Sequence, residues 1–350
     1  MISQKSRFDL AVIMPVLNEE KHIGQTLEQL YQQDFPMDRL EIVVADGGST
    51  DRTREIVESY KKRFGSLKLL ENPTSKPSSG RNAGVKNSTA PYVVVIDGHV
   101  HIPSKTLLRD IVNLFQSTQA ACLCRQQPLT PPGINEFELS VALCRTSFFG
   151  TSPVQKYSDF EGEVDPAFYG SMWTRETFEK IGYFDEQFDA CEDIDFNFRV
   201  RQAALKSYLS QKLTVFFFPR SSLQGLWRQM FRYGLGRFRF VRKHNLMAPV
   251  QWLAGAGVAG LALMALLSFL YTPAFDVFKS LVALYLLIVV LFSAGLAAKD
   301  KHLGCLLYGP LIFPVIHFGF GIGFLSGLLE RFTGPRRYRS KTNSQTLSLI

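Results

Sequence analysis

Cysteine is scarce in this sequence, and its spacing excludes the usual structural roles of the residue. The 350 residues include only five cysteines, and no pair of Cys-x-x-Cys clusters occurs among them. A zinc site of that kind and a disulfide framework are therefore not expected. Cys122 and Cys124 would point to the same face of a strand. We interpret the cysteines as small core or near-core residues.

The N-terminal sequence has no apolar segment of the kind that forms a secretory signal. It reads Met-Ile-Ser-Gln-Lys-Ser-Arg-Phe, whereas a signal peptide carries an apolar region of about 7–15 residues near its start. We therefore expect the first domain to remain in the cytosol.

Long apolar runs are missing up to about residue 243, and three of them follow. They cover residues 253–270, 277–298 and 303–329, and Lys279 is the only Asp, Glu, Lys or Arg within them. A bilayer crossing takes about 20 apolar residues. We predict a membrane domain over residues 248–330 with about three transmembrane segments, in a multi-pass protein of the plasma (inner) membrane.

The pattern leaves open on which side the basic tail, residues 331–350, lies. Three simple crossings would place its arginines outside, against the tendency of basic loops to stay inside. The last run also contains Pro310, Pro314 and several glycines. A re-entrant segment that returns to the cytosol is the alternative.

The net charge of +8 is concentrated just before the first apolar run. Residues 220–247 combine basic and aromatic side chains: Arg220, Arg228, Arg232, Arg237, Arg239, Arg242 and Lys243 with Trp227, Phe231, Phe238 and Phe240. Such a mixture is typical of a nucleic-acid-binding surface. Its position beside a membrane segment instead favours an amphipathic helix that lies on anionic lipid headgroups. We therefore predict membrane lipids, and no nucleic acid, as partners.

Strand and helix patterns alternate along the first hundred residues. Apolar runs at 10–14, 40–45, 67–70 and 92–97 read as buried strands, and segments with helical spacing lie between them. This alternation predicts an α/β fold with a mostly parallel, doubly wound sheet. Further elements are expected as helices at 103–116, 136–148 and after 175 and 192, and as strands at 120–124, 170–175 and 213–218.

Polar clusters occur where these strands end or helices begin. They are Asn18-Glu19-Glu20, Asp46 with Asp51, Asp97-Gly98-His99, and Glu192-Asp193. Each alone is explained as a cap or a strand terminator, and Glu192 and Asp193 would be favoured by the helix dipole. In an open α/β sheet, however, ligands bind outside the carboxyl ends of the strands. Together the clusters indicate one crevice.

Five motifs in this order resemble the family 2 inverting glycosyltransferases, which have the GT-A fold. They are Val12-Ile-Met-Pro-Val-Leu-Asn-Glu-Glu20, Val43-Val-Ala-Asp-Gly-Gly-Ser-Thr-Asp51, Gly80-Arg-Asn-Ala-Gly84, Ile96-Asp-Gly-His99 and Cys191-Glu-Asp193. Gln229-Met-Phe-Arg232-Tyr233 further resembles the Gln-x-x-Arg-Trp signature of membrane polysaccharide synthases, with Tyr in place of Trp. The combination is most similar to the succinoglycan-type exopolysaccharide glucosyltransferases. The resemblance implies a GT-A domain over residues 1–219, followed by an interface segment at 220–247.

The resemblance also assigns donor-binding roles. Pro15 and Glu20 would line the base and ribose side of a nucleotide-sugar pocket, and Asp46 would accept a hydrogen bond from uracil. Arg81 would reach the ribose or the diphosphate, because a guanidinium suits phosphate oxygens. Asp97 would lie at the diphosphate.

A divalent metal is the cofactor that the resemblance implies, held by Asp97 and His99. Most of the family has a carboxylate at the position of His99, so this sequence departs from the commonest pattern. Mn²⁺ tolerates imidazole better than Mg²⁺ does. Two alternatives follow: Mn²⁺ bound by both residues, or Mg²⁺ bound by Asp97 with His99 touching phosphate.

Transfer with inversion needs a base for the acceptor hydroxyl. The Glu192-Asp193 pair supplies candidates, of which Asp193 is the predicted base. Gln229, Arg232 and Tyr233 would lie at the acceptor and diphosphate end, with Tyr233 as a stacking platform; the alternative is that the aromatic residues only anchor a helix at the lipid interface.

The predicted function is hexosyl transfer, from a UDP-glucose-like donor to a lipid-linked saccharide. The alternatives are a polyprenyl-phosphate hexose synthase and a non-catalytic membrane scaffold that binds nucleotide sugars. The sequence leaves the sugar, the linkage and the acceptor length undetermined.

Overall fold

The computed structural model describes residues 6–150, 159–168, 170–246 and 249–333. These residues form two compact units. The first contains the described residues between 6 and 133 and between 159 and 218, and the second contains those between 134 and 150 and from 219 onward. The first unit ends at residue 218, one residue before the predicted end of the GT-A domain, but the second unit also includes residues 134–150, which the prediction placed inside that domain.

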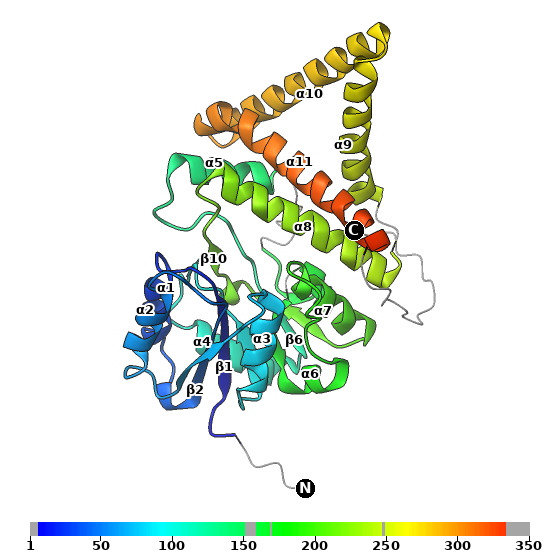
Figure 1. The fold of residues 1–350 in the computed structure, drawn as a ribbon. Coiled ribbons are helices and arrows are strands. Elements are labelled where there is room, and N and C mark those ends of the chain that lie inside the picture. Colours follow the sequence, from blue (N-terminus) through cyan, green and yellow to red (C-terminus); the bar gives the residue numbers. More distant parts are fainter. Residues whose placement is uncertain (1–5, 151–158, 169, 247–248, 334–350) are drawn as a thin grey trace. The chain divides into compact units, whose positions relative to one another are not determined.

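The first unit is built on a sheet whose first four strands are parallel. They are β1 (Leu10–Val16), β2 (Leu40–Asp46), β3 (Leu67–Glu71) and β4 (Tyr92–Val95), in the spatial order β3-β2-β1-β4. The helices between them are α1 (Ile23–Tyr31), α2 (Thr53–Tyr60) and α3 (Pro77–Lys86) (Figure 1). β1 and β2 are almost wholly buried, as expected for central strands covered on both faces. The predicted α/β fold is confirmed.

The second half of the sheet is mixed. β8 (Gly170–Thr174) runs antiparallel to β4 and to β6 (Cys122–Cys124), and β9 (Ser207–Leu209) and β7 (Gly162–Glu163) complete the order β8-β6-β9-β7. The helices of this half are α4 (Leu107–Thr118), α6 (Arg175–Ile181) and α7 (Glu192–Gln202). Since β4 and β6 are both antiparallel to β8, their carboxyl ends lie at the same edge as those of β1 and β2.

Two sequence-based boundaries differ from the structure. The strand expected to reach Asp97 ends at Val95, and the strand expected at 213–218 is a 3₁₀ turn at Gln211–Leu213 followed by β10 (Phe216–Phe217). β10 pairs with β5 (Val100–His101) in a separate two-stranded sheet. Strands of two or three residues, including β7 and β9, are too short to show a period in the sequence.

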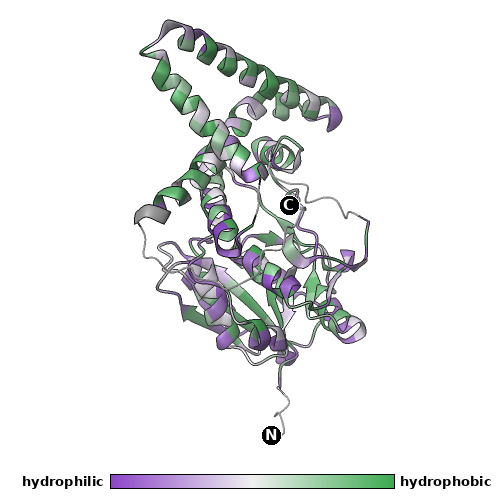
Figure 2. Ribbon diagram, turned by 90° about the vertical axis from the view of Figure 1, so that its right-hand side faces the viewer, coloured by the Kyte–Doolittle hydropathy of each residue, from purple (hydrophilic) through white to green (hydrophobic). Residues whose placement is uncertain are grey.

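Helices connected by short turns and loops make up the described residues of the second unit. It contains α5 (Glu136–Thr146), α8 (Leu223–His244), α9 (Pro249–Ser268), α10 (Thr272–Lys299) and α11 (Gly304–Thr333). The three predicted apolar runs are the helices α9, α10 and α11, along which hydrophobic residues predominate (Figure 2). All three are long and apolar enough to cross a membrane. The predicted tail lies, from residue 334 on, outside the described residues.

The cysteines are buried and free, as expected from their spacing. Cys122 and Cys124 belong to β6, where neither side chain reaches solvent. Hence they contribute to the core of the sheet and not to a ligand site.

Candidate active site

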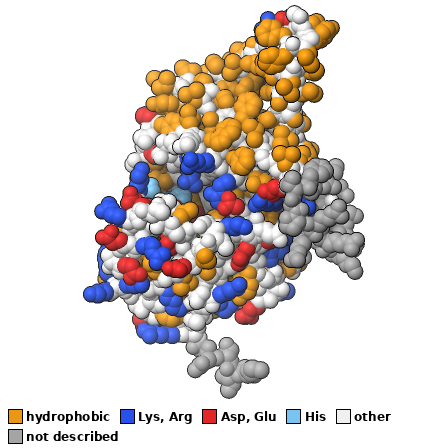
Figure 3. All heavy atoms as spheres, in the orientation of Figure 1, with side chains coloured by type: hydrophobic (Ala, Val, Ile, Leu, Met, Phe, Trp, Pro, Cys, Tyr) orange, Lys and Arg blue, Asp and Glu red, His pale blue; other side chains and the backbone are white. Residues whose placement is uncertain are grey.

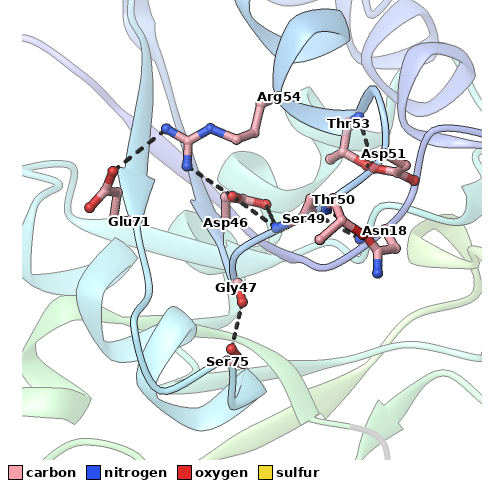
Figure 4. Close-up of polar contacts among 10 residues, drawn as sticks. All are labelled: Asn18, Asp46, Gly47, Ser49, Thr50, Asp51, Thr53, Arg54, Glu71 and Ser75. Atoms are coloured by element: carbon pink, nitrogen blue, oxygen red, sulfur yellow. Dashed lines mark hydrogen bonds and ion pairs between the residues drawn. The ribbon is translucent and has the colours of Figure 1, made fainter.

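The loop after β2 is fixed by the Asp46 carboxylate. Asp46 is 1% exposed, and it accepts hydrogen bonds from the Ser49 amide at 3.2 Å and from Nη1 of Arg54 at 3.0 Å (Figure 4). Arg54 also approaches Glu71 on β3, at 3.7 Å. The predicted uracil acceptor therefore already has a cationic partner within the unit.

The loops after β1 and β2 are joined by hydrogen bonds. Oδ1 of Asn18 accepts a bond from the Thr50 amide at 2.8 Å, and Oε2 of Glu20 accepts one from the Arg52 amide at 3.2 Å. Asn18 has a left-handed φ of 56°, which Asn tolerates better than most residues. Pro15, on β1, lies against Gly80 of α3, where a Cβ would come within 3.2 Å of the proline. The predicted base-and-ribose residues thus share one strand-end region.

Asp51 stabilises the start of α2. Burial acts to raise the pKa of Asp51, but hydrogen bonds from the side chain and amide of Thr53 outweigh it and lower the pKa. This is the helix-start role that the sequence suggested.

Asp97 and His99 follow β4 and differ in their partners. The half-buried Asp97 carboxylate makes no hydrogen bond or ion pair with any residue that the structure describes. Nδ1 of His99 lies 2.8 Å from Oε1 of Glu19, and the ring meets Phe217 edge-on. Asp97 therefore presents free oxygen ligands, whereas one nitrogen of His99 is occupied by a carboxylate.

Arg81 is paired with the carboxylate that begins α7. Nη1 of Arg81 lies 3.0 Å from Oε1 of Glu192, and both side chains are largely buried. Burial raises the pKa of Glu192; Arg81 opposes this, while Asp193 and Asp97 add to it. Four of the predicted site residues therefore form one electrostatic cluster.

The other acidic residues of the first turn of α7 have different roles. Asp195 is fully buried and binds Nε of Arg199 at 3.1 Å, one turn further along the helix. Asp193 is half-buried and forms no ion pair within the described residues. Of the three carboxylates, Asp193 is the one that has no cationic partner among the described residues.

Arg125 is a member of the cluster that the sequence analysis missed. It follows β6 and is 2% exposed, and its Nη2 donates to the carbonyl of Val95 at 3.0 Å. Nε and Nη1 are buried without a hydrogen-bond partner in the described chain. Burial lowers the pKa of Arg125 to about 10, with Asp97 opposing that shift and Arg81 adding to it. Arg125 follows its strand directly, and a single basic residue in that position gives no periodic signal in the sequence.

The predicted acceptor residues lie on α8 of the helical unit, together with a second residue that was missed. Nη1 of Arg145, on α5, donates to Oε1 of Gln229 at 3.2 Å, and its guanidinium lies over the Tyr233 ring at 5.8 Å. Burial lowers the pKa of Arg145, Tyr233 opposes that shift, and Arg220 adds to it. Arg232 is exposed on the same helix. The Gln-x-x-Arg-Tyr motif is thus completed by a cation from a distant part of the chain.

The described residues contain no group of three or more His, Cys, Asp or Glu that could hold a metal ion. A cation that bridges two phosphates requires fewer protein ligands, because one or two carboxylates suffice beside phosphate and water oxygens. The free oxygens of Asp97 fit that requirement.

Comparisons with known proteins agree with the fold and motifs. Residues 11–182 match the model of glycosyl transferase family 2. The chain belongs to this family. It is therefore an enzyme, a glycosyltransferase with a GT-A domain followed by three long apolar helices.

Two curated relatives of this glycosyltransferase cover most of its length. The succinoglycan biosynthesis protein ExoA of Rhizobium meliloti is 27% identical over 73% of this chain and 77% of its own. A dolichyl N-acetyl-α-D-glucosaminyl phosphate 3-β-D-2,3-diacetamido-2,3-dideoxy-β-D-glucuronosyltransferase of Methanococcus voltae is 24% identical over 92% of this chain and 97% of its own.

Among solved structures, the mannosyltransferase PcManGT of Pyrobaculum calidifontis, in complex with GDP-mannose and Mn²⁺, has the same fold. It is 18% identical with a TM-score of 0.59, and the match covers 93% of this chain and 88% of that one.

Proposed function

We propose that this glycosyltransferase transfers a hexose, with inversion, from a UDP-glucose-like donor to a lipid-linked saccharide during polysaccharide assembly. The observation that carries the proposal is the cluster of Asp97, Arg81, Arg125, Glu192 and Asp193 at one edge of the sheet. Two guanidiniums beside one carboxylate that is paired with Arg81, and two that form no ion pair within the described residues, suit a departing diphosphate and an incoming hydroxyl. The names of the two curated relatives support a glycan pathway and a lipid-linked acceptor.

On the donor side, we assign Pro15 and Glu20 to the base and ribose, and Asp46 to the uracil. Arg54 would hold the Asp46 carboxylate in position through their ion pair. Arg81 and Arg125 face the diphosphate, where the two buried N–H groups of Arg125 would find acceptors.

A divalent metal would be held by Asp97, which would supply the protein oxygens, and by His99, whose ring is oriented by Glu19. The bound metal would neutralise the two phosphates that leave. Mn²⁺ in a solved structure of the same fold supports this cofactor.

Asp193 is the base that accepts the proton of the acceptor hydroxyl. Glu192 forms an ion pair with Arg81, whereas Asp193 has no cationic partner in the described residues. Gln229, Arg232 and Tyr233 receive the acceptor sugar and its diphosphate, with Arg145 holding Gln229 in place.

Sugar transfer from radiolabelled nucleotide sugars to lipid extract tests these roles. Membranes with wild type, Asp193→Asn or the exposed control Asp38→Asn are compared. Loss of a general base should lower turnover by about 10²–10⁴-fold in Asp193→Asn only. Equal turnover in the first two would refute the base, transfer to bare polyprenyl phosphate would favour a hexose synthase, and no turnover with any donor would favour a scaffold.

Removal and replacement of the metal distinguish the role of Asp97 from that of His99 in metal binding. A chelator should abolish transfer, and added Mn²⁺ or Mg²⁺ should restore it in wild type but not in Asp97→Ala. If His99→Ala regains full activity with both metals, the histidine is a neighbour of the site and not a ligand.

We further propose that the first unit, which is the catalytic unit, is cytosolic and that the second, the helical unit, is embedded in the plasma membrane. Outward leucines along α9 and α10 support this placement: Leu253 is 72% exposed and Leu291 is 60% exposed. A surface of this kind is stable in hydrocarbon and not in water.

A further inference from the structure

Helix α11 differs from the other two apolar helices in how much of it is covered. In the most apolar part of each helix, 6% of residues are buried in α9, 17% in α10 and 44% in α11. Hydrophobic side chains cover much of the visible surface of the helical unit (Figure 3). A large part of α11 is therefore packed against protein where α9 and α10 are not.

Helix α8 covers more of α11 than α5, α9 or α10 does, and glycines create the contact. Gly319, Gly323 and Gly327 recur every fourth residue on α11. A Cβ on Gly323 would overlap the carbonyl oxygen of Phe231, and one on Gly327 would overlap the Phe238 ring. This small-xxx-small pattern lets two helix backbones approach closely.

The contact is long, and the two helices run in the same direction. Gly319 meets Met230, Gly323 meets Phe231, and Gly327 meets Phe238, so positions on both helices advance together. Further along, Oε1 and Oε2 of Glu330 accept bonds from Arg239 at 2.7 and 3.0 Å. Figure 1 shows α8 and α11 side by side. The second half of α11 must therefore lie at the same level of the membrane as α8.

Helix α8 cannot cross a bilayer. It carries six basic side chains within 22 residues, Arg228, Arg232, Arg237, Arg239, Arg242 and Lys243. Charges are excluded from the hydrocarbon, and an amphipathic basic helix lies in the plane of the interface. α8 also begins only six residues after β10 of the catalytic unit, so it starts on the side where that unit lies.

The start of α11 is tied to the same side through α5. Nε2 of His302 lies 3.1 Å from Oγ of Ser140, and Nε2 of His317 lies 2.8 Å from the carbonyl oxygen of Phe149. The chain enters α5 from the catalytic unit and returns to that unit afterwards. Both ends of α11 are therefore held by elements that stay on one face of the membrane.

We propose that α8 and α11 lie together in the membrane interface, and that only α9 and α10 cross, as a helical hairpin. In this arrangement the α8 arginines face anionic headgroups, and exposed leucines of α11, such as Leu307 and Leu311, face acyl chains. α9, with 20 residues, is about 30 Å long, which matches the bilayer core. The chain after α11 then lies on the side of the catalytic unit. The inference rests on the membrane placement proposed above.

Single cysteines test this topology in the full-length protein. Ser59→Cys reports the catalytic unit, Thr272→Cys the turn between α9 and α10, and Ser344→Cys the polar sequence after α11. The five native cysteines are buried, so wild type serves as the unlabelled control. A membrane-impermeant maleimide is applied to spheroplasts and to inside-out vesicles, and donor hydrolysis confirms that each variant is folded.

We expect Ser59→Cys and Ser344→Cys to be labelled in inside-out vesicles, and Thr272→Cys in spheroplasts. Labelling of Ser344→Cys together with Thr272→Cys would show that α11 crosses, which overturns the inference and leaves the membrane placement intact. Labelling of Ser59→Cys and Thr272→Cys from one side would overturn the hairpin and the membrane placement together.

Discussion

The two units of this glycosyltransferase differ in how many apolar side chains they leave exposed. In the catalytic unit, apolar residues of β1, β2 and β4 are hidden, and a buried charge such as Glu41 is paired, here with Lys68 at 2.8 Å. In the helical unit, Leu284 and Leu287 of α10 are more than half exposed, while Ser293 is fully buried and bonds the carbonyl of Val289. Apolar side chains are thus hidden from the solvent in the catalytic unit, as in water, and exposed along α10 in the helical unit, as in lipid.

The largest expected difference between the two units is in the loss of stability when one apolar residue of each is replaced by alanine. Ile13 is fully buried in the central strand β1, so Ile13→Ala should cost about 2–5 kcal/mol. Leu287 is 55% exposed, and Leu287→Ala should cost less than about 1 kcal/mol, because no cavity forms and alanine remains apolar. Midpoints of thermal inactivation in detergent measure both. Equal losses would show that Leu287 is packed against protein.

A matched pair of glycines tests whether helix packing, and not lipid alone, stabilises the helical unit. Gly323→Ala should destabilise by about 1–3 kcal/mol, because the new methyl group overlaps the backbone of α8. Gly295→Ala on α10 adds the same methyl group where nothing lies within 4 Å, so its stability should be unchanged or slightly higher. Thermal inactivation again provides the comparison; similar behaviour of the two variants would contradict the α8–α11 contact.

The smallest expected effect concerns the buried carboxyl of the catalytic unit. Burial raises the pKa of Glu192 in the folded state, so folding retains its proton after the unfolded chain has released it. Stability is then complete below the unfolded pKa and falls as pH rises through the folded pKa. Glu192→Gln lacks this titration.

The difference in thermal midpoint between Glu192→Gln and wild type should therefore shift in favour of the variant as pH rises. Asp38→Asn, at an exposed site, is the control that should show no such trend. A constant difference across the pH range would mean that Arg81 fully compensates for the burial of Glu192.

Most of the sheet and four members of the active-site cluster were predictable from local pattern. β1 is an uninterrupted apolar run, β2 is apolar from Ile42 to Ala45 and ends at Asp46, and Glu192 begins a helix as its charge and the helical spacing predicted. Arg125 was not predicted as a site residue, because one basic residue after a three-residue strand gives no periodic signal. Arg145 was not predicted as a site residue, because its partners, Gln229 and Tyr233, are more than 80 positions away in the sequence.

The sequence by itself determined the elements: an α/β sheet with acidic residues at its strand ends, a basic amphipathic helix, and three apolar helices. It did so because burial and hydrogen bonding impose periods of two and 3.6 residues on any chain. Only the tertiary structure decided the pairings, that Glu192 belongs to Arg81, that His99 faces Glu19, and that α11 packs along α8. Such pairings depend on which surfaces meet in three dimensions, and no local period records them.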